Sequence, residues 1–129
     1  MTIAVHPLKG GEAYHVLMVR EISLQCQAEV TLRIVERSSP QATGILHSWE
    51  IYRGYETFNT ASAMFAEVVE LLKTPIFLKW YAIPCLKCVT VVVSNQDEDI
   101  QAALVSCGFY VNHQFQTTTI YEYDISRAK

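Results

Sequence analysis

The stretch CVTVVVSNQDEDIQAALVSCGF at residues 88–109 decides the fold, because it predicts a strand, a turn and a helix in immediate succession. Residues 89–93 are almost wholly apolar, which is typical of a central strand covered on both faces. Asp97 or Asn95 is the expected helix cap. Gly108 stands where the helix needs a residue in the left-handed conformation to end it. The stretch therefore predicts a strand-helix unit inside a sheet.

Upstream of this unit, apolar and polar residues alternate with the period of two that predicts antiparallel strands with one wet face. Between positions 14 and 34 most apolar residues fall on even numbers, and the odd positions from 23 to 33 are all polar. The run is too long for one ordinary strand, so a break is expected near Arg20 and Glu21. A polar turn at 38–44 then leads into a strand at 45–52. The residues expected to share one face of that strand are Ile45, His47, Trp49 and Ile51.

Residues 61–72 predict an amphipathic helix, because apolar residues recur along one face at helical spacing. Its buried face is expected to hold Ala61, Met64, Phe65, Val68, Val69 and Leu72. Asn59 or Thr60 is the expected cap, and strands are predicted at 76–83 and 115–125. The fold class is α+β: an antiparallel β-meander followed by α-β-α-β, with one mixed sheet and helices packed on it.

Composition and charge limit the classes of function that this protein can have. The 129 residues suffice for one domain, predicted at 13–129 behind a flexible N-terminal arm at 1–12 that holds a short strand at 2–5. The formal net charge is −3 and the basic residues are scattered, which argues against a nucleic-acid partner. No apolar run is long enough for a membrane span. With no secretory signal, the expected location is cytoplasmic, with reduced cysteines.

The elements from residue 45 onward resemble the C-terminal part of the GCN5-related N-acetyltransferase (GNAT) family. The resemblance rests on the strand, polar turn and helix that end in Gly108-Phe109, and on Arg53-Gly54 before a helix. It implies acetyl-coenzyme A bound where two parallel strands splay. The cofactor-binding residues that it implies are Arg53, Gly54, Val93 and Ser94.

The chain departs from the family's pattern at its most specific chemical positions. Glu56 and Phe58 stand where the family's pyrophosphate loop has glycines, and a Glu side chain there would repel phosphate. Asp97 replaces the usual Asn at the start of the second helix, and Leu104 replaces the Tyr that acts as general acid. No catalytic residue is therefore predicted.

Two cysteines, Cys85 and Cys88, form a CxxC pair. A structural zinc site would need a second pair of ligands, and a redox dithiol would need its first Cys at a helix start. Neither condition is met in the sequence, so no metal is predicted. A turn with one buried and one exposed thiol is the simpler interpretation, although a redox or metal role stays open.

The favoured function is a small non-enzymatic binding or regulatory protein without a cofactor, whose partner is a second copy of itself or another protein. The hypothesis rests on the missing catalytic groups and on aromatic side chains, a residue type that dominates interfaces. The predicted ligand or partner surface comprises His47, Trp49, Tyr52, Tyr55 and Trp80. The alternative is a divergent acetyl-coenzyme A-dependent N-acetyltransferase. A third idea is an apolar pocket lined by His47, Trp49 and Trp80.

Overall fold

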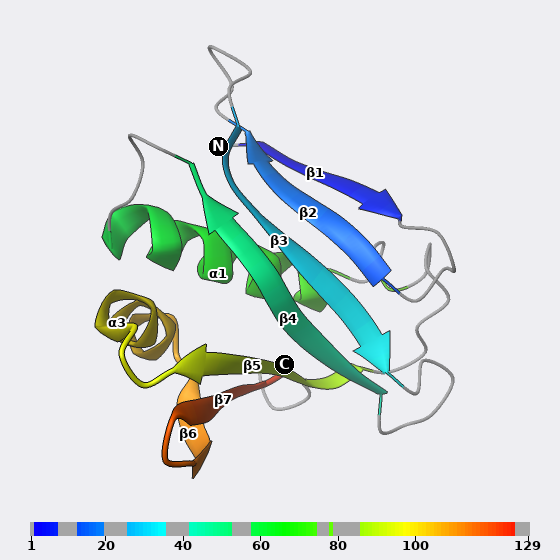
Figure 1. Ribbon diagram of the computed structural model, residues 1–129. Coiled ribbons are helices and arrows are strands. Elements are labelled where there is room, and N and C mark those ends of the chain that lie inside the picture. The colour runs from blue at the N-terminus through cyan, green and yellow to red at the C-terminus, as the bar shows by residue number, and fades with distance from the viewer. Residues whose placement is uncertain are drawn as a thin grey trace.

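The structure is a computed structural model that describes residues 2–7, 13–19, 26–35, 42–52, 58–74, 78 and 86–125. These residues form one seven-stranded sheet with the strand order β1-β2-β3-β4-β5-β7-β6 (Figure 1). The elements in chain order are β1 (Thr2–Pro7), β2 (Ala13–Val19), β3 (Cys26–Val35), β4 (Ala42–Ile51), α1 (Phe58–Lys73), β5 (Leu86–Ser94), α3 (Glu98–Ser106), β6 (Tyr110–Gln114) and β7 (Thr118–Asp124). The predicted α+β class with one mixed sheet is confirmed.

The sheet is antiparallel except at one place. The strands β1 to β4 form the predicted antiparallel meander, and β7 pairs antiparallel with both β5 and β6. Only β4 and β5 run parallel within the described sheet, because α1 carries the chain back between them. The break predicted near Arg20 falls between β2 and β3. Within the predicted N-terminal arm, β1 extends two residues beyond the expected strand at 2–5.

Helix α1 buries the face that its sequence predicts, and all six apolar residues of that face lie in the core. Phe65 is fully buried and makes edge contacts with Trp49 of β4 and Phe109, with ring centroids 5.9 and 6.3 Å away. The helix begins at Phe58, so the prediction that Asn59 or Thr60 caps it is wrong. Both residues lie in its first turn instead.

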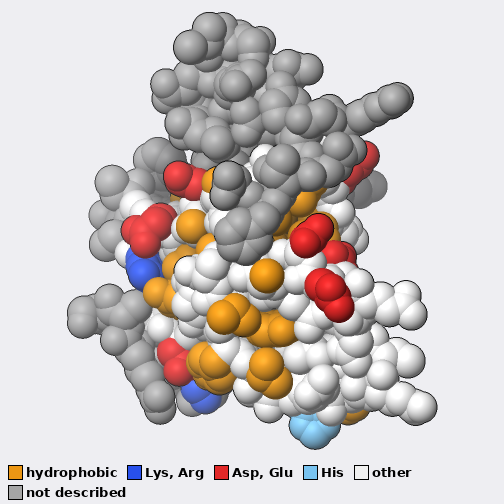
Figure 2. Space-filling view, turned by 90° about the vertical axis from the view of Figure 1, so that its left-hand side faces the viewer, with side chains coloured by type: hydrophobic (Ala, Val, Ile, Leu, Met, Phe, Trp, Pro, Cys, Tyr) orange, Lys and Arg blue, Asp and Glu red, His pale blue; other side chains and the backbone are white. Residues whose placement is uncertain are grey.

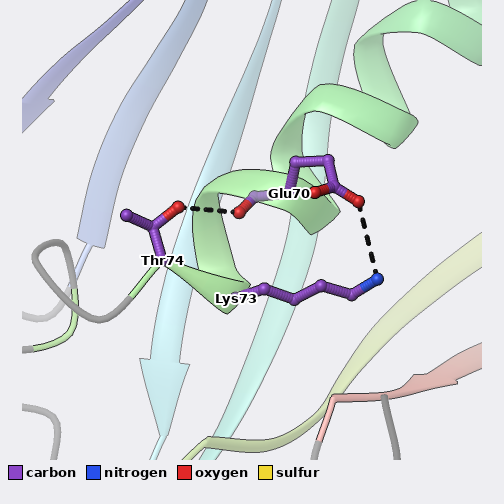
Figure 3. Close-up of polar contacts among 3 residues, drawn as sticks. All are labelled: Glu70, Lys73 and Thr74. Atoms are coloured by element: carbon purple, nitrogen blue, oxygen red, sulfur yellow. Dashed lines mark hydrogen bonds and ion pairs between the residues drawn. The ribbon is translucent and has the colours of Figure 1, made fainter. Parts of the chain in front are cut away.

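The last turn of α1 is held by local polar contacts (Figure 3). Thr74 Oγ1 donates a hydrogen bond to the Glu70 carbonyl oxygen at 2.9 Å, and Lys73 Nζ lies 3.5 Å from Glu70 Oε1. Lys73 also lies over the ring of Tyr123, and this neighbour is the main cause that raises the pKa of Lys73. The helix thus ends at the predicted place, and a lysine stands where the helix dipole favours positive charge.

Helix α3 ends in a Schellman motif. The Phe109 N–H donates to the Leu104 carbonyl and the Gly108 N–H to the Val105 carbonyl, both at 3.0 Å. Gly108 adopts a positive φ of 98°, and Phe109 is buried, as predicted. At the other end Asp97 is the N-cap by position, but its side chain makes no capping hydrogen bond.

Two predicted elements differ from the structure. Of the strand predicted at 76–83 only Leu78 is described, and it is helical, with its N–H donating to the Thr74 carbonyl. The strand predicted at 115–125 is present as β7, but it is preceded by a strand that was not predicted, β6, with which it forms a hairpin. Every residue of β6 is exposed, so this edge strand carries no alternation of buried and exposed residues for a sequence pattern to detect.

Candidate functional site

The two parallel strands separate before they end. Their last paired residues are Leu46 of β4 and Val91 of β5, although β4 continues to Ile51 and β5 to Ser94. In Figure 1 the two strands start together and then diverge toward α3 and the first turn of α1. We call the space between the separated ends of β4 and β5 the strand gap. The backbone groups on its two sides have no partner in the opposite strand.

A β-bulge lies in β4 beside the strand gap. Glu29 pairs with Glu50 and Thr31 with His47, so β4 holds one more residue than β3 at this place. Ser48 is one of the two β4 residues inside the bulge, and it has a positive φ of 53°. Bulges of this kind bend a strand and redirect its side chains, and they are frequent beside active sites.

The bulge changes which side chains of β4 face the helices. Before it, Ala42, Gly44 and Leu46 are buried, whereas after it Trp49 packs against Phe65 in the core. His47 is exposed. The prediction that His47 and Trp49 share one face with Ile45 is therefore wrong, because one extra residue reverses the alternation.

Ser48 offers a direct test of this bulge. Ser48→Val should lower the free energy of unfolding by about 1 kcal/mol, because a β-branched side chain is poorly tolerated at positive φ. Ser48→Gly, the matched control, should stay within about 0.5 kcal/mol of the wild type, because glycine adopts this conformation freely. Urea unfolding of both variants measures the difference. Equal stability of the two variants would contradict the bulge geometry.

The β5 side of the strand gap presents backbone donors. Asn95 N–H donates to the Thr117 carbonyl at 3.0 Å, and in the same ladder Val93 pairs with Thr119. Because bonded residues alternate along an antiparallel pair, Val92 and Ser94 direct their N–H groups away from β7 and toward the gap. Hydrogen-bond donors therefore line this edge.

The structure brings only some of the predicted site residues to the gap. Ser94 is exposed at its edge, whereas the Val93 side chain is buried in the core. Trp49 and Tyr52 are half-buried, and His47 Nδ1 lies 3.0 Å from Ser48 Oγ. The remaining predicted residues lie outside the described residues: Arg53, Gly54, Tyr55 and Trp80. His47 and Trp49 point to opposite faces, and the third residue of the predicted apolar pocket, Trp80, lies outside the described residues, so that pocket stays a prediction.

No proton donor stands at the position that the resemblance gives to the general acid. Leu104 there is fully buried. The face onto which the gap opens carries hydrophobic side chains flanked by acidic ones (Figure 2). Because Leu104 cannot act as an acid, a chemical role for the strand gap depends on its backbone N–H groups. The identity of the residues does not show where such groups point.

The cysteines give no sign of catalysis. Burial raises the pKa of the Cys88 thiol and of the Cys107 thiol, so both are weaker nucleophiles than an exposed cysteine. Cys107 Sγ donates to the Ser62 carbonyl at 3.1 Å, which joins α3 to α1. Cys85 lies outside the described residues. Among the residues that are described, no group of three or more His, Cys, Asp or Glu side chains could hold a metal ion.

No protein-family model and no curated protein matches this chain. Solved structures match it in fold. The spermidine/spermine N-acetyltransferase SpeG from Vibrio cholerae has a TM-score of 0.70 at 10% identity, over 94% of this chain and 74% of that one. PseH from Campylobacter jejuni, an N-acetyltransferase in complex with acetyl coenzyme A, has a TM-score of 0.65 at 6% identity, over 88% and 68%. A putative acetyltransferase from Sphaerobacter thermophilus has a TM-score of 0.58 at 12% identity, over 88% and 70%.

These comparisons confirm the resemblance to the GNAT family at the level of the fold. The chain spans between 60% and 74% of the length of eight solved chains that it resembles. The prediction of a non-enzymatic binding protein as the main function is contradicted, because the structural neighbours are acetyltransferases, most of them of the GNAT type, and favour the alternative. No helix in the described part of the chain is long and apolar enough to cross a membrane.

Proposed function

We propose that this protein is a divergent acyltransferase that transfers an acyl group from acyl-coenzyme A to an amine. The observation that carries the proposal is the strand gap, where β4 and β5 stop pairing after Leu46 and Val91. A neighbour of the same fold holds acetyl coenzyme A, and two of the named neighbours, SpeG and PseH, are N-acetyltransferases. An amine is therefore the proposed acceptor class.

The donors along the β5 edge suit the pantetheine arm of coenzyme A. That arm is an extended chain with two amide groups, so it can pair with an open strand edge as an added strand would. Val92 and Ser94 would donate N–H groups to its carbonyl oxygens. Unpaired backbone groups in such a gap gain hydrogen bonds when the ligand binds, which supports binding without charged side chains.

The bound thioester would supply an activated acyl group. The chain's own contribution would be to orient it and to donate backbone N–H groups to the oxygen on which charge develops. The amine nitrogen would bond to the acyl carbon and lose a proton to solvent as the carbon–sulfur bond breaks. Leu104 has no proton to give, so the departing thiolate would take its proton from solvent. We therefore propose slow turnover compared with an enzyme that has an acid at this position, since general acid catalysis contributes about 10²–10⁴-fold.

A thermal-shift titration tests the proposal. Coenzyme A and acetyl-coenzyme A should raise the unfolding midpoint, because ligand at 100 times its dissociation constant stabilises the native state by about 2.7 kcal/mol. Adenosine 3′,5′-bisphosphate is the matched control, since it lacks the pantetheine arm, and it should give a smaller shift. No shift with millimolar coenzyme A would refute the proposal.

Activity is the second test. Release of free thiol from acetyl-coenzyme A should depend on added amine, with spermidine and an amino sugar as first acceptors.

The cytoplasmic location and the self-association remain predictions from the sequence. Sedimentation velocity at high micromolar concentration would test the self-association, and a monomer there would contradict it.

A further inference from the structure

One side chain secures the end of β5. Gln101, on α3, directs its amide nitrogen Nε2 at three backbone carbonyl oxygens, those of Asn95 (3.1 Å), Ser94 (3.3 Å) and Asp97 (3.4 Å). Its Oε1 accepts a hydrogen bond from the Tyr121 hydroxyl of β7 at 3.0 Å. Gln101 therefore joins the end of β5, the start of α3 and the middle of β7.

Gln101 binds the turn before α3 through carbonyl oxygens, which differs from a helix cap, because a cap accepts hydrogen bonds from backbone N–H groups. Asp97 makes no side-chain hydrogen bond at the N-terminus of α3, so the turn between β5 and α3 lacks the usual capping interaction. The Asp97 N–H and Gln101 Nε2 both bond to the Ser94 carbonyl. The Ser94 carbonyl is therefore held by α3 and the turn before it, while the alternation of the β5–β7 ladder directs the Ser94 N–H toward the strand gap.

We propose that Gln101 is a positioning residue that holds the Ser94 N–H in the direction needed to bind the ligand in the strand gap. The inference rests on the proposed function and deepens it. Gln101 itself would not touch the ligand, and it would act only by holding the end of β5 in place. A backbone donor binds well only when its direction is fixed beforehand, because a hydrogen bond weakens steeply with misalignment.

Two substitutions test separately the hydrogen bonds that Gln101 donates and the one that it accepts. Gln101→Glu keeps the oxygen that accepts from Tyr121 but removes the donor to Ser94 and Asn95, and its negative charge repels their carbonyls. Tyr121→Phe is the matched control, because it removes the hydroxyl and leaves the donors of Gln101 in place. If Gln101→Glu fails to fold, Gln101→Met removes the donors at similar length without a charge.

Isothermal titration with coenzyme A measures the effect at a temperature where circular dichroism shows each variant fully folded. Gln101→Glu should weaken binding at least about fivefold, as expected when hydrogen bonds are lost. Tyr121→Phe should stay within about twofold of the wild type. Equal weakening by both substitutions would mean a merely structural contact, and unchanged binding by Gln101→Glu would also overturn the proposal.

Nuclear magnetic resonance of the free protein separates this proposal from the proposed function. The amide signals of Val92 and Ser94 should shift or broaden in Gln101→Glu and stay in place in Tyr121→Phe. Unchanged amide signals in Gln101→Glu would refute the positioning role whether or not the protein binds coenzyme A. If the wild type binds no coenzyme A, the acyltransferase proposal fails and these amide signals still decide the role of Gln101.

Discussion

Replacing Phe65 by Ala is expected to lower the free energy of unfolding by about 3–5 kcal/mol, the largest stability effect predicted for this protein. Phe65 is fully buried and touches Trp49 of β4 on one side and Phe109 after α3 on the other. Its ring therefore joins the two halves of the domain. Truncation removes buried apolar area and leaves a cavity between three elements that cannot all move inward.

Chemical unfolding in urea, followed by far-ultraviolet circular dichroism, measures this effect. Val105→Ala is the matched control, because Val105 is 57% exposed on α3 and its truncation should change stability by less than about 0.5 kcal/mol. A loss below about 1.5 kcal/mol for Phe65→Ala would contradict the packing, since it would place Phe65 outside a closed core.

Gly108→Ala is expected to cost about 1–3 kcal/mol. A φ of 98° is a conformation that residues with a side chain rarely adopt, and a Cβ at this position would lie 3.1 Å from Tyr123 Cε2. Strain in the backbone and crowding against the tyrosine ring act together. The substitution should also loosen the two hydrogen bonds that end α3.

The contribution of each cause can be separated. Gly108→Asn has the same Cβ but a side chain that tolerates positive φ better, so it should destabilise less than Gly108→Ala if backbone strain dominates. Equal losses would assign the cost to the contact with Tyr123. Thermal unfolding of both variants decides, and a loss below about 0.5 kcal/mol for Gly108→Ala would contradict the left-handed conformation of Gly108 at the end of α3.

Local chemistry made much of the fold predictable. The apolar face of α1 is a direct consequence of helical spacing, and Gly108 followed by Phe109 specifies the end of α3 within a few residues. By contrast, β6 was missed because exposure of every residue leaves no periodic pattern. Asp97 stands at the expected cap position, but its side chain makes no capping hydrogen bond, and Gln101, four residues later, binds the carbonyl oxygens of the same turn instead.

The candidate site was harder to predict because it consists of backbone groups. Where β4 and β5 separate depends on a pairing between residues more than 40 positions apart, which no local pattern records. The inference of a non-enzymatic protein relied on missing side chains such as an acid at Leu104. Almost every residue carries a backbone N–H group like that of Ser94. Residue types therefore do not reveal which of these groups lies in a binding site.

The extra residue at Ser48 has a consequence for tracing the ancestry of this protein. The bulge shifts the inward-facing positions of β4 by one, from even-numbered residues up to Leu46 to odd-numbered residues from Trp49 onward. An alignment with a distant homologue that allows no gap at this place would match core residues to surface residues over the rest of the strand. Searches guided by structure, with an insertion permitted at Ser48, should therefore recover relatives that ungapped sequence profiles pass over.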